Sequence, residues 1–460
     1  MKLEAVILAA GKGARMYSDA PKVLHPLAGR ALLERVIICT HTLAPAAIHV
    51  VYGFGGEQVP RALAHLEKIN CGINWVLQAK QQGTGHAVQQ ALPHIDATSV
   101  VLVLYGDVPL IQSQTLQKLI DLAAPGMLAL LTTELPDPSG YGHIVRDSRG
   151  DVIRIVEHKD ATPAQRALCE INTGILAVSA RLLQKWLEYL KNDNAQGEYY
   201  LTDIVAMAVA DGVKVMTAQP QANWEIMGVN NKMQLAELER VAQRNSARAL
   251  LERGVTLYDP ERIDIRGTLT TGRDVVIDVN VVFEGDVILG DRVYIGPHSV
   301  IRASQIGNDV MIKSHCVVDE AEIGERCIIG PFARVRPQTR LGAGAHIGNF
   351  VEIKKSEVGA GSKINHLSYV GDSHIGRDVN IGAGVITCNY DGVNKYRTTI
   401  GDGAFIGSDC QLIAPVEVGA GATIGAGSTI TLNAPPEALT VGRAKQKTIT
   451  GWKRPIKKSK

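Results

Sequence analysis

The sequence predicts an α/β protein with a mainly parallel sheet in its first half and a parallel β-helix in its second half. Three observations carry this prediction. Short apolar runs alternate with helical patterns up to about residue 230, and a charged segment without Gly or Pro follows. From about residue 263, an aliphatic residue followed by Gly recurs at intervals of six residues.

The alternation in the first half begins with a buried strand over 5–10, which leads into a glycine-rich loop. Apolar strands separated by helices are typical of a parallel sheet that is covered on both faces. Ligands bind such sheets beyond the carboxyl ends of the strands, where the loops 11–15 and 106–109 would lie. The next expected elements are a helix and two strands, over 32–43, 48–52 and 100–105.

The segment 233–251 reads MQLAELERVAQRNSARALL and places Leu235, Leu238 and Val241 at helical spacing, with Gly254 as a stop after it. We interpret the segment as one helix that joins two domains. The predicted organisation is a first domain over 1–232, a helical linker over 233–253 and a second domain over 254–460.

The repeats of the second half run from Leu289-Gly290 to Ile424-Gly425, and longer gaps keep roughly the phase set by the six-residue units. In a hexapeptide-repeat β-helix, each aliphatic side chain points into a narrow core and the Gly permits the turn. The interval between Gly382 and Gly401 breaks this phase and contains Thr387–Gly392. We expect an ejected loop there, with a functional role.

Composition argues against several classes of partner. The 48 basic and 46 acidic residues give a net charge of +2, which supplies no broad attraction for nucleic acid or for an anionic membrane. The seven cysteines form no CxxC pair, and no signal peptide or apolar span is evident. A soluble, cytoplasmic protein is therefore expected. The basic tail 443–460 carries one Trp and is interpreted as a solvated segment.

The first chemical signal is the loop after the first strand, which reads Leu8-Ala9-Ala10-Gly11-Lys12-Gly13-Ala14-Arg15-Met16 and is followed by Pro21-Lys22. Its glycines allow backbone N–H groups to approach a phosphate, and Arg15 and Lys22 add positive charge. Met16 stands where a dinucleotide fingerprint has its third Gly, and the spacing of a P-loop is absent as well. A glycine turn without a ligand is the alternative for this segment taken alone.

Further motifs make the pattern specific. With Gln78, Gly83-Thr84-Gly85-His86, Tyr105-Gly106-Asp107 and the hexapeptide half, the loop resembles the bacterial family of bifunctional N-acetylglucosamine-1-phosphate uridyltransferases and glucosamine-1-phosphate N-acetyltransferases, nearly end to end. The resemblance implies a Rossmann-like nucleotidyltransferase domain, a connecting helix and a left-handed parallel β-helix. It also implies a homotrimer with acetyl-transfer sites between solenoids, and a supply of UDP-N-acetylglucosamine for peptidoglycan and lipopolysaccharide precursors.

For the first domain, the resemblance implies uridylyl transfer from UTP to N-acetylglucosamine-1-phosphate with release of pyrophosphate. Arg15 and Lys22 would stabilise the triphosphate, and Asp107 and Asn230 would bind Mg²⁺. Taken without the resemblance, Asp107 before Pro109 would simply open a turn, and Asn230 would cap the helix that follows it. The residues implied in nucleotide and sugar binding are Leu8, Ala9, Ala10, Gly11, Lys22, Gln78, Gly83, Thr84, Tyr105, Gly106, Asp107, Gly142, Glu157, Asn172 and Asn230.

For the second domain, the resemblance implies acetyl transfer from acetyl-CoA to glucosamine-1-phosphate, as the step before uridylyl transfer. His366 would be the general base, since a neutral imidazole is suited to take a proton from the attacking amine. Glu352 is a further candidate for orienting the amine or His366. The implied glucosamine-1-phosphate ligands are Arg336, Lys354, Tyr369 and Asn380. The implied acetyl-CoA ligands are Ala383, Asn389, Tyr390, Ser408, Ala426 and Arg443.

Alternatives stay open at this point. A single-function nucleotidyltransferase with a regulatory solenoid would have no reason to carry His366, Asn389-Tyr390 and Arg443. A non-catalytic scaffold would have no reason to gather charges on a glycine loop and a strand end. For His366 alone, a solvated histidine is the simpler interpretation. The histidines of the second half show no zinc-binding spacing, so zinc is not expected.

Overall fold

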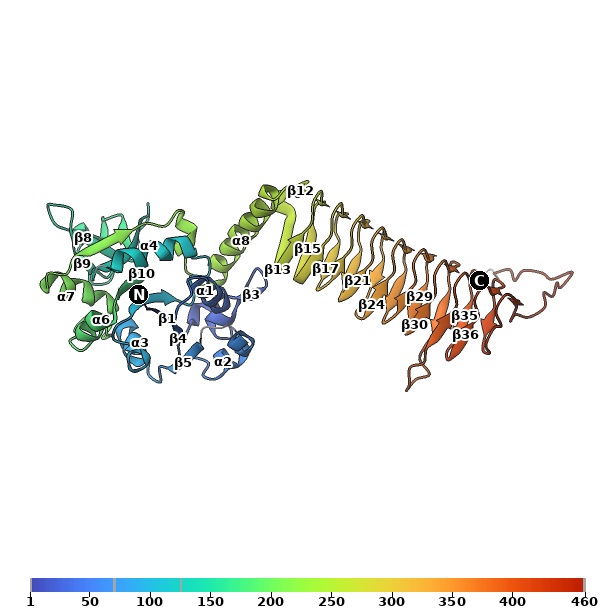
Figure 1. Ribbon diagram of the computed structural model, residues 1–460, viewed down its shortest axis with the longest axis horizontal. Helices are drawn as coiled ribbons and strands as arrows, with labels where there is room; N and C mark the ends of the chain where they lie inside the picture. The colour runs from blue at the N-terminus through green and yellow to red at the C-terminus, as the bar shows by residue number, and fades with distance from the viewer. Residues whose placement is uncertain (1, 69–71, 125, 458–460) are drawn as a thin grey trace. The chain divides into compact units, whose positions relative to one another are not determined.

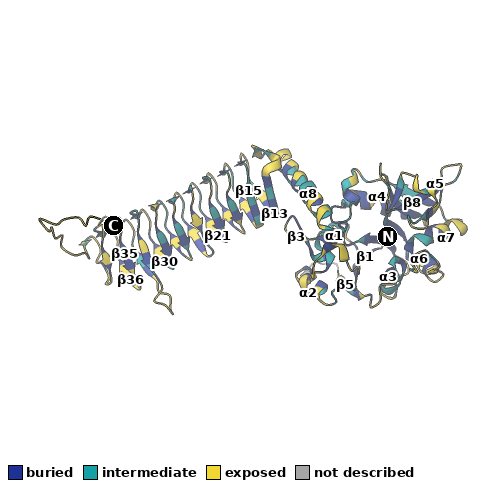
Figure 2. Ribbon diagram, turned by 180° about the vertical axis from the view of Figure 1, so that it is seen from behind, coloured by how far each residue is buried: buried dark blue, intermediate teal, exposed yellow. Residues whose placement is uncertain are grey.

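The computed structural model describes residues 2–68, 72–124 and 126–457. The chain forms two compact units that divide between Ala242 and Gln243. This division falls inside α8 (Lys232–Glu252), the helix that the sequence places near 233–253. Each unit has a buried apolar core of its own (Figure 2).

The first unit is built on one sheet, and most of its inner strands are parallel. β10 is the exception, because it runs antiparallel to both β6 and β7. The strands lie in the order β11-β7-β10-β6-β1-β4-β5, and β8 and β9 form an antiparallel hairpin that extends from β10. Their bounds are β1 (Leu3–Ala9), β4 (Ala47–Tyr52), β5 (Gly72–Leu77), β6 (Val100–Tyr105), β7 (Leu128–Glu134), β8 (Gly142–Arg146), β9 (Val152–Val156), β10 (Glu170–Ser179) and β11 (Val215–Ala218).

Helices cover both faces of this sheet, as Figure 1 shows. Alternate residues of β1 enter two separate cores, with Ala5 and Ile7 in one and Val6 and Leu8 in the other. The first core includes side chains of α1 (Leu32–His41) and α4 (Ser113–Ala123), and the second includes side chains of α3 (Thr84–Ala91), α6 (Ala180–Leu187) and α7 (Ile204–Ala210). Burial on both sides explains why β1 is a continuous apolar run rather than an alternating one.

Shorter elements connect this framework. The helices α2 and α5 are one to two turns long, and β2 and β3 form a small hairpin. The glycine-rich loop contains η1, and Lys22 opens η2. Their bounds are η1 (Ala14–Met16), η2 (Lys22–Leu24), β2 (Pro26–Leu27), β3 (Arg30–Ala31), α2 (Gln58–Ala62) and α5 (Pro163–Arg166).

The second unit is a solenoid of parallel strands, stacked coil upon coil in three columns (Figure 1). The first column contains β12 (Thr256–Leu257), β14 (Val276–Ile277), β16 (Tyr294–Ile295), β19 (Met311–Ile312), β22 (Ile328–Ile329), β25 (His346–Asn349), β28 (Lys363–His366), β31 (Asn380–Ile381), β34 (Phe405–Ile406), β37 (Thr423–Ile424) and β39 (Leu439–Thr440). The long strands β13 (Ile263–Thr271) and β15 (Val281–Leu289) start the other two columns.

The second and third columns belong to one sheet. The second continues with β17 (Val300–Arg302), β20 (Val317–Asp319), β23 (Arg334–Val335), β26 (Glu352–Lys354), β29 (Tyr369–Gly371), β32 (Ile386–Cys388), β35 (Gln411–Ile413) and β38 (Thr429–Ile430). The third continues with β18 (Gln305–Ile306), β21 (Ala321–Ile323), β24 (Thr339–Leu341), β27 (Glu357–Val358), β30 (Ser373–Ile375), β33 (Thr398–Ile400) and β36 (Val416–Val418).

The repeat phase matches the coils. Ile295, Ile312, Ile329, Ile347 and Ile364 pair in succession along the first column, and all are buried in one continuous core. Stacking therefore buries the aliphatic positions of neighbouring coils against one another, as solenoids require. The predicted parallel β-helix of hexapeptide repeats is confirmed.

One coil carries the ejected loop. Between β32 and β33 the chain leaves the stack, and Tyr390 pairs with Lys395 across the loop. The backbone N–H of Tyr396 donates to the carbonyl of Asn389 at 2.9 Å, which closes the base of the loop. The segment is thus anchored at its base and extends away from the solenoid core.

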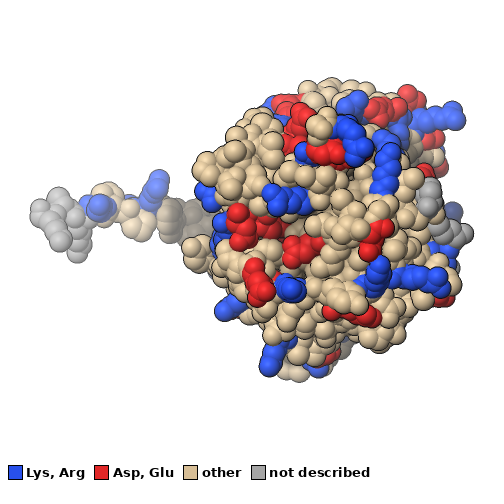
Figure 3. Space-filling model, turned by 90° about the vertical axis from the view of Figure 1, so that its left-hand side faces the viewer, with Lys and Arg blue, Asp and Glu red and all other residues tan. Residues whose placement is uncertain are grey.

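The surface carries charges of both signs. On the face drawn in Figure 3, Lys and Arg side chains are interspersed with Asp and Glu, and neither sign forms a broad patch. In the part of the chain that the structure describes, no helix combines the length and apolar character needed to cross a membrane.

Candidate active sites

The carboxyl ends of β1 and β6 meet at a cavity of about 470 Å³. Leu8 pairs with Tyr105 across the two strands, and the N–H of Gly106 donates to the carbonyl of Leu8 at 2.9 Å. The glycine loop and the turn after β6 therefore lie at one edge of the sheet. The predicted residues that line this cavity are Leu8, Ala9, Ala10, Gly11, Lys22, Gln78, Gly83, Thr84, Tyr105 and Asp107, joined by Lys12, Val23, Gln81, Ala87 and Glu198.

A second cavity, of about 280 Å³, shares Tyr105 and Asp107 with the first. The predicted Arg15 and Asn230 line it. Its other lining residues are Val108, Ser139, Gly140, Tyr141, Thr173, Ile226, Gly228 and Gln234. The first unit thus holds two adjacent compartments that meet at the end of β6.

Lys22 links the two proposed metal ligands. Its ammonium forms an ion pair with the carboxylate of Asp107 and donates to Oδ1 of Asn230 at 3.3 Å. The side chains of Asp107 and Lys22 are largely buried, with 18% and 12% of their surface exposed. Gly13 has a φ of +62°, and a Cβ there would lie 2.6 Å from Cβ of Lys22. The glycine loop can therefore lie close against Lys22 only because residue 13 has no side chain.

The oxygens of Asp107 and Asn230 already converge on one cationic group. A carboxylate and an amide oxygen are the hard donors that Mg²⁺ prefers, and such sites leave further positions to phosphate and water. The residues present therefore fit a magnesium ion shared with a nucleotide. Among the described residues, no cluster of three or more His, Cys, Asp or Glu side chains is suited to a metal.

Tyr105 lines both cavities and packs against a glycine. Gly174 has a φ of +84°, and a Cβ there would lie 2.4 Å from the Tyr105 ring. Burial raises the pKa of the Tyr105 phenol, with Glu157 and Asp107 adding to the effect. The Tyr105 side chain is thus an uncharged part of the cavity lining, and its ring can occupy this position only because residue 174 has no side chain.

The three residues predicted to contact the sugar lie together. Gly142 on β8 pairs with Asn172 on β10, and a Cβ on Gly142 would lie 3.4 Å from Oε1 of Glu157. Glu157 accepts a hydrogen bond from the hydroxyl of Thr202 at 2.9 Å, and burial raises the pKa of this carboxyl. These three residues form one cluster, beside the segment 139–141 that lines the second cavity.

In the second unit, one corner of the solenoid collects His366 and four of the predicted acetyl-CoA ligands. The pairs Ile364–Ile381, Ile381–Ile406 and Ile406–Ile424 set the register between successive coils. The residues two positions after these isoleucines therefore follow one another along the corner. We call this set the corner file, and it consists of Asn349, His366, Ala383, Ser408 and Ala426. Arg443 donates to the carbonyl of Ala426 and so joins its end.

His366 is exposed and its ring is held by a neighbour in the file. Nδ1 of His366 lies 2.9 Å from Oδ1 of Asn349. The hydroxyl of Ser368 donates to the carbonyls of His366 and Gly382, so it is engaged with the backbone. The Glu352 carboxylate, a candidate for orienting the amine or His366, pairs with Arg336 at 2.7 Å. A guanidinium within reach on the adjacent coil is the stronger partner for a carboxylate.

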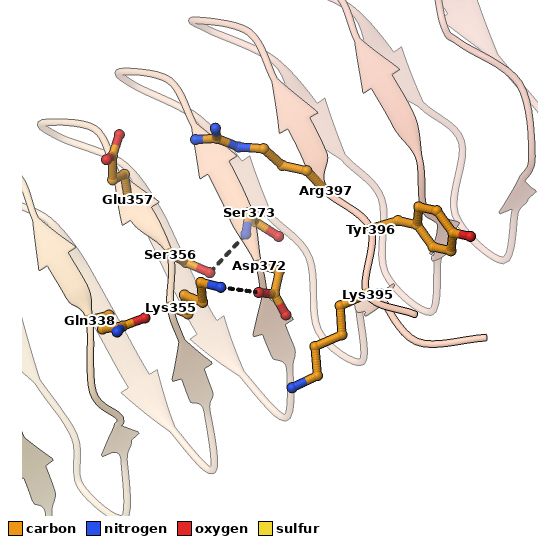
Figure 4. A pocket seen from close by; sticks show the side chains of 9 residues that line it. All are labelled: Gln338, Lys355, Ser356, Glu357, Asp372, Ser373, Lys395, Tyr396 and Arg397. Atoms are coloured by element: carbon orange, nitrogen blue, oxygen red, sulfur yellow. Dashed lines mark hydrogen bonds and ion pairs between the residues drawn. The ribbon is translucent and has the colours of Figure 1, made fainter. Parts of the chain in front are cut away.

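Cations gather near the base of the ejected loop. Lys395 lowers the pKa of Lys354, and burial and then Arg336 add smaller effects, since like charges disfavour protonation. The loop and the solenoid also enclose a cavity of about 410 Å³, and Figure 4 shows the Lys395 side chain extending from the loop toward the coils that carry Lys355 and Asp372. Lys395 thus places a third positive charge beside two predicted sugar-phosphate ligands.

Other predicted residues lie around this cluster. A Cβ on Gly371 would lie 2.4 Å from the Tyr369 hydroxyl and 2.8 Å from Nδ2 of Asn389, so these two groups flank one glycine. Asn389 donates to Oδ2 of Asp372 at 2.6 Å, and the Tyr390 hydroxyl donates to the carbonyl of Gly392 at 2.5 Å. Asn380 lies apart from them, on β31 in the first column.

Sequence reasoning missed several residues of these sites. Asn349 was detectable, because it precedes His366 by one coil at the same position of the repeat. Lys395 lies in the loop that the break in the repeat phase had marked. Nothing in the sequence shows that this lysine approaches Lys354. Tyr141, just before β8, and Thr173, on β10, line the second cavity from positions that carry no motif.

The fold and these sites define a nucleotidyltransferase domain joined to a hexapeptide-repeat transferase solenoid. The family profile of the MobA-like NTP transferase domain matches residues 5–257. The profile of the bacterial transferase hexapeptide (six repeats) matches residues 269–303, 303–337, 320–355 and 397–431.

Full-length relatives place the chain more narrowly. It is 59% identical over 460 residues to the Bifunctional protein GlmU of Nitrosospira multiformis, covering 100% of this chain and 99% of the relative. It is 58% identical over 456 residues to the Bifunctional protein GlmU of Aromatoleum aromaticum, covering 99% of each. The chain belongs to the GlmU family of bifunctional proteins. Among solved structures, UDP-glucose pyrophosphorylase complexed with UDP-glucose aligns at a TM-score of 0.45 and 16% identity, covering 53% of this chain and 100% of that one.

Proposed function

We propose that the chain catalyses two reactions at separate sites. The second unit transfers an acetyl group from acetyl-CoA to glucosamine-1-phosphate. The first unit then transfers a uridylyl group from UTP to the N-acetylglucosamine-1-phosphate so formed, and the product is UDP-N-acetylglucosamine. The observation that carries the proposal is the corner file, since a solenoid serving only regulation has no need of His366 in one register with Ala383, Ser408 and Ala426, or of Arg443 bonded to Ala426 at the end of this set.

In the uridylyl reaction, a phosphate oxygen of the sugar phosphate attacks the α-phosphorus of UTP in line. One P–O bond forms, the bond to the β-phosphate breaks, and pyrophosphate leaves. The two adjacent cavities suit this geometry, with the nucleotide in the larger one and the sugar phosphate in the smaller. Arg15 and Lys22 would neutralise the charge that develops, and catalysis would come from positioning and electrostatics.

Asp107 and Asn230 would hold Mg²⁺, which on binding neutralises phosphate charge and polarises the α-phosphorus. Lys22 would then turn from these two oxygens toward the triphosphate, within the same space. Gly142, Glu157 and Asn172 would bind the N-acetylglucosamine moiety, with Gly142 leaving room beside the Glu157 carboxylate.

In the acetyl reaction, the sugar amine attacks the thioester carbon, and His366 takes a proton from the amine. A C–N bond forms, the C–S bond breaks, and CoA leaves as the thiol. Arg336, Lys354 and Tyr369 would bind the sugar phosphate, and Lys395 adds a further cation for the phosphate. The backbone N–H of Ala383 would stabilise the oxyanion of the thioester.

We further propose a cytoplasmic homotrimer. Phe332, Phe350 and Leu367 follow one another along the solenoid beside the corner file and are 47%, 55% and 63% exposed. The rings of His315, Phe332 and Phe350 stack with centroids 4.8 and 5.3 Å apart. An exposed apolar row of this kind supports contact with another copy of the chain, and light scattering of the purified protein measures its size.

The test is an assay of the purified chain with glucosamine-1-phosphate, acetyl-CoA, UTP and Mg²⁺, in which CoA thiol and pyrophosphate are followed separately. We expect wild type to release both. His366→Ala should lower the rate of CoA release by roughly 10²- to 10⁴-fold, the share that a general base contributes. The same variant should still release pyrophosphate from UTP and supplied N-acetylglucosamine-1-phosphate.

Two results would overturn the proposal. A wild-type chain that releases pyrophosphate only from the N-acetylated sugar, and never CoA thiol, would make the solenoid a regulatory element. A loss of pyrophosphate release in His366→Ala would mean that the two sites are not separate.

A further inference from the structure

The corner file contains an amide in direct contact with the imidazole that the proposed function uses. Asn349 and His366 are register partners on β25 and β28, and Oδ1 of Asn349 lies 2.9 Å from Nδ1 of His366. An amide oxygen has no proton to give, so Nδ1 must carry the proton in this bond. In the neutral ring, Nε2 then keeps its lone pair.

The backbones on either side hold this pair in place. A Cβ on Gly348 would lie 1.9 Å from the carbonyl oxygen of Asn365, so the two strands approach closely just before the pair. Just after it, the N–H of Leu367 donates to the carbonyl of Asn349 at 3.1 Å. Both residues are therefore fixed by their own strands, and the side-chain bond does not need to order a flexible segment.

Among the residues that the structure describes, the hydrogen-bond partner of Nδ1 of His366 is Asn349. His366 lies close enough to His346 on β25 to help lower the pKa of that imidazole, after burial and two lysines, and β31 presents the uncharged Asn380 beside Lys363. Glu352 is paired with Arg336. No hydrogen bond to Nε2 of His366 occurs among the residues that the structure describes, so this nitrogen faces solvent or substrate.

We propose that Asn349 is a positioning residue for His366: it fixes the Nδ1–H tautomer and the ring orientation, and so leaves Nε2 as the atom that takes the proton from the attacking amine. This inference rests on the proposed acetyl transfer for its chemistry. The tautomer itself follows from the contact and does not depend on that activity.

Three variants of the full-length chain test it. Asn349→Leu removes the acceptor, Asn349→Asp keeps an acceptor and adds a charge, and Ser314→Leu places the same apolar side chain at the equivalent corner position two coils earlier. We expect Asn349→Leu to lower kcat of acetyl transfer roughly 10- to 100-fold with KM for glucosamine-1-phosphate nearly unchanged, since orientation and not binding is lost. Ser314→Leu should retain wild-type kcat.

Asn349→Asp, the conservative variant, should change the pH dependence of kcat, which would stay the same if Asn349 had only a structural role. The carboxylate of Asn349→Asp favours the imidazolium, so the acidic limb of the kcat profile should shift to higher pH while activity above it is retained. In ¹⁵N-histidine-labelled protein, the His366 signals should report Nδ1–H in wild type and a mixture of tautomers in Asn349→Leu.

The outcomes separate the two proposals. Wild-type kcat, pH profile and tautomer in Asn349→Leu would overturn the role of Asn349. If the Nδ1–H tautomer of wild type is lost in Asn349→Leu, the role of Asn349 is supported, whether or not the chain releases CoA. A chain that never releases CoA overturns only the proposed acetyl transfer.

Discussion

At the scale of single residues, the glycines of the repeat differ in how closely the next coil approaches them. Gly348 and Gly425 occupy the same position after an aliphatic residue. A Cβ on Gly348 would lie 1.9 Å from the carbonyl oxygen of Asn365, which is backbone and cannot turn away. A Cβ on Gly425 would meet Cγ2 of Val441 at 3.0 Å, the end of a side chain.

This difference predicts unequal effects of one substitution. Gly348→Ala should destabilise the solenoid by roughly 1–3 kcal/mol, the typical cost of forcing an extra carbon into a packed site. Gly425→Ala should be close to neutral, because Val441 yields and Ala lowers the entropy of the unfolded chain. Calorimetric unfolding of both variants measures the difference, and equal shifts would show that the coils relax freely around residue 348.

At the scale of elements, α8 closes the open end of the solenoid, and the side chain of Gln243 supplies the polar part of this closure. Gln243 is 2% exposed. Its Nε2 donates to the carbonyl of Ile265 at 3.0 Å, and its Oε1 accepts from the N–H of Ile265 at 2.7 Å. The amide thus satisfies both backbone groups of a residue on β13, where no earlier coil can pair with it. Ala247 and Leu250 of the same helix pack into the solenoid core.

Gln243→Met tests this closure, because Met has a similar volume and no polar atoms to offer Ile265. We expect the solenoid to lose roughly 1–3 kcal/mol of stability, the cost of a buried backbone group without a partner. Arg248→Met is the control on the same helix, since its pair with Glu252 is exposed and worth about 0.5 kcal/mol or less. Hydrogen exchange at Ile265 should accelerate in the first variant only.

The elements also show what the sequence can predict. β1, β6 and α1 lie within a few residues of their expected bounds, because continuous apolar runs and helical spacing are local signals. The antiparallel course of β10 and the β8–β9 hairpin depend on pairing across the sheet, which local pattern does not encode. The contact of Asn349 with His366 needs the register between coils, and the pairing of Glu352 needs Arg336 from another coil.

At the scale of the whole molecule, the two units have separate cores and separate buried polar groups. The first unit buries Glu4 and His49 on neighbouring strands of its sheet, at 2% and 0% exposed. Nε2–H of His49 donates to Glu4 at 2.9 Å, and the hydroxyl of Ser99 donates to the other carboxylate oxygen at 2.8 Å. Three of the four tryptophans, Trp75, Trp186 and Trp224, belong to this unit, and Trp452 of the second unit is already exposed in the folded chain, so the change in tryptophan fluorescence follows the unfolding of the first unit.

Both buried groups destabilise the first unit on acidification. Burial lowers the pKa of His49 below its ordinary value of 6.5, against the effect of Glu4. Burial alone would raise the pKa of Glu4, but hydrogen bonds from His49, Ser99 and Lys2 outweigh it and lower the pKa below 4.5. In each case the unfolded chain binds more protons than the folded one. Stability is therefore full above the ordinary pKa and is lost as the pH falls through the folded value.

The first unit should consequently lose stability below about pH 6.5 through His49, and more steeply below about pH 4.5 through Glu4. Glu4→Gln keeps a hydrogen-bonding side chain and removes the lower titration, so its unfolding midpoint should vary less with pH below 4.5 than that of wild type. Urea unfolding followed by tryptophan fluorescence at several pH values measures this slope. Glu188→Gln, at an exposed position after α6, is the matched control and should follow wild type. A slope in Glu4→Gln as steep as that of wild type would mean that the acid sensitivity of this unit arises elsewhere than at the Glu4–His49 pair.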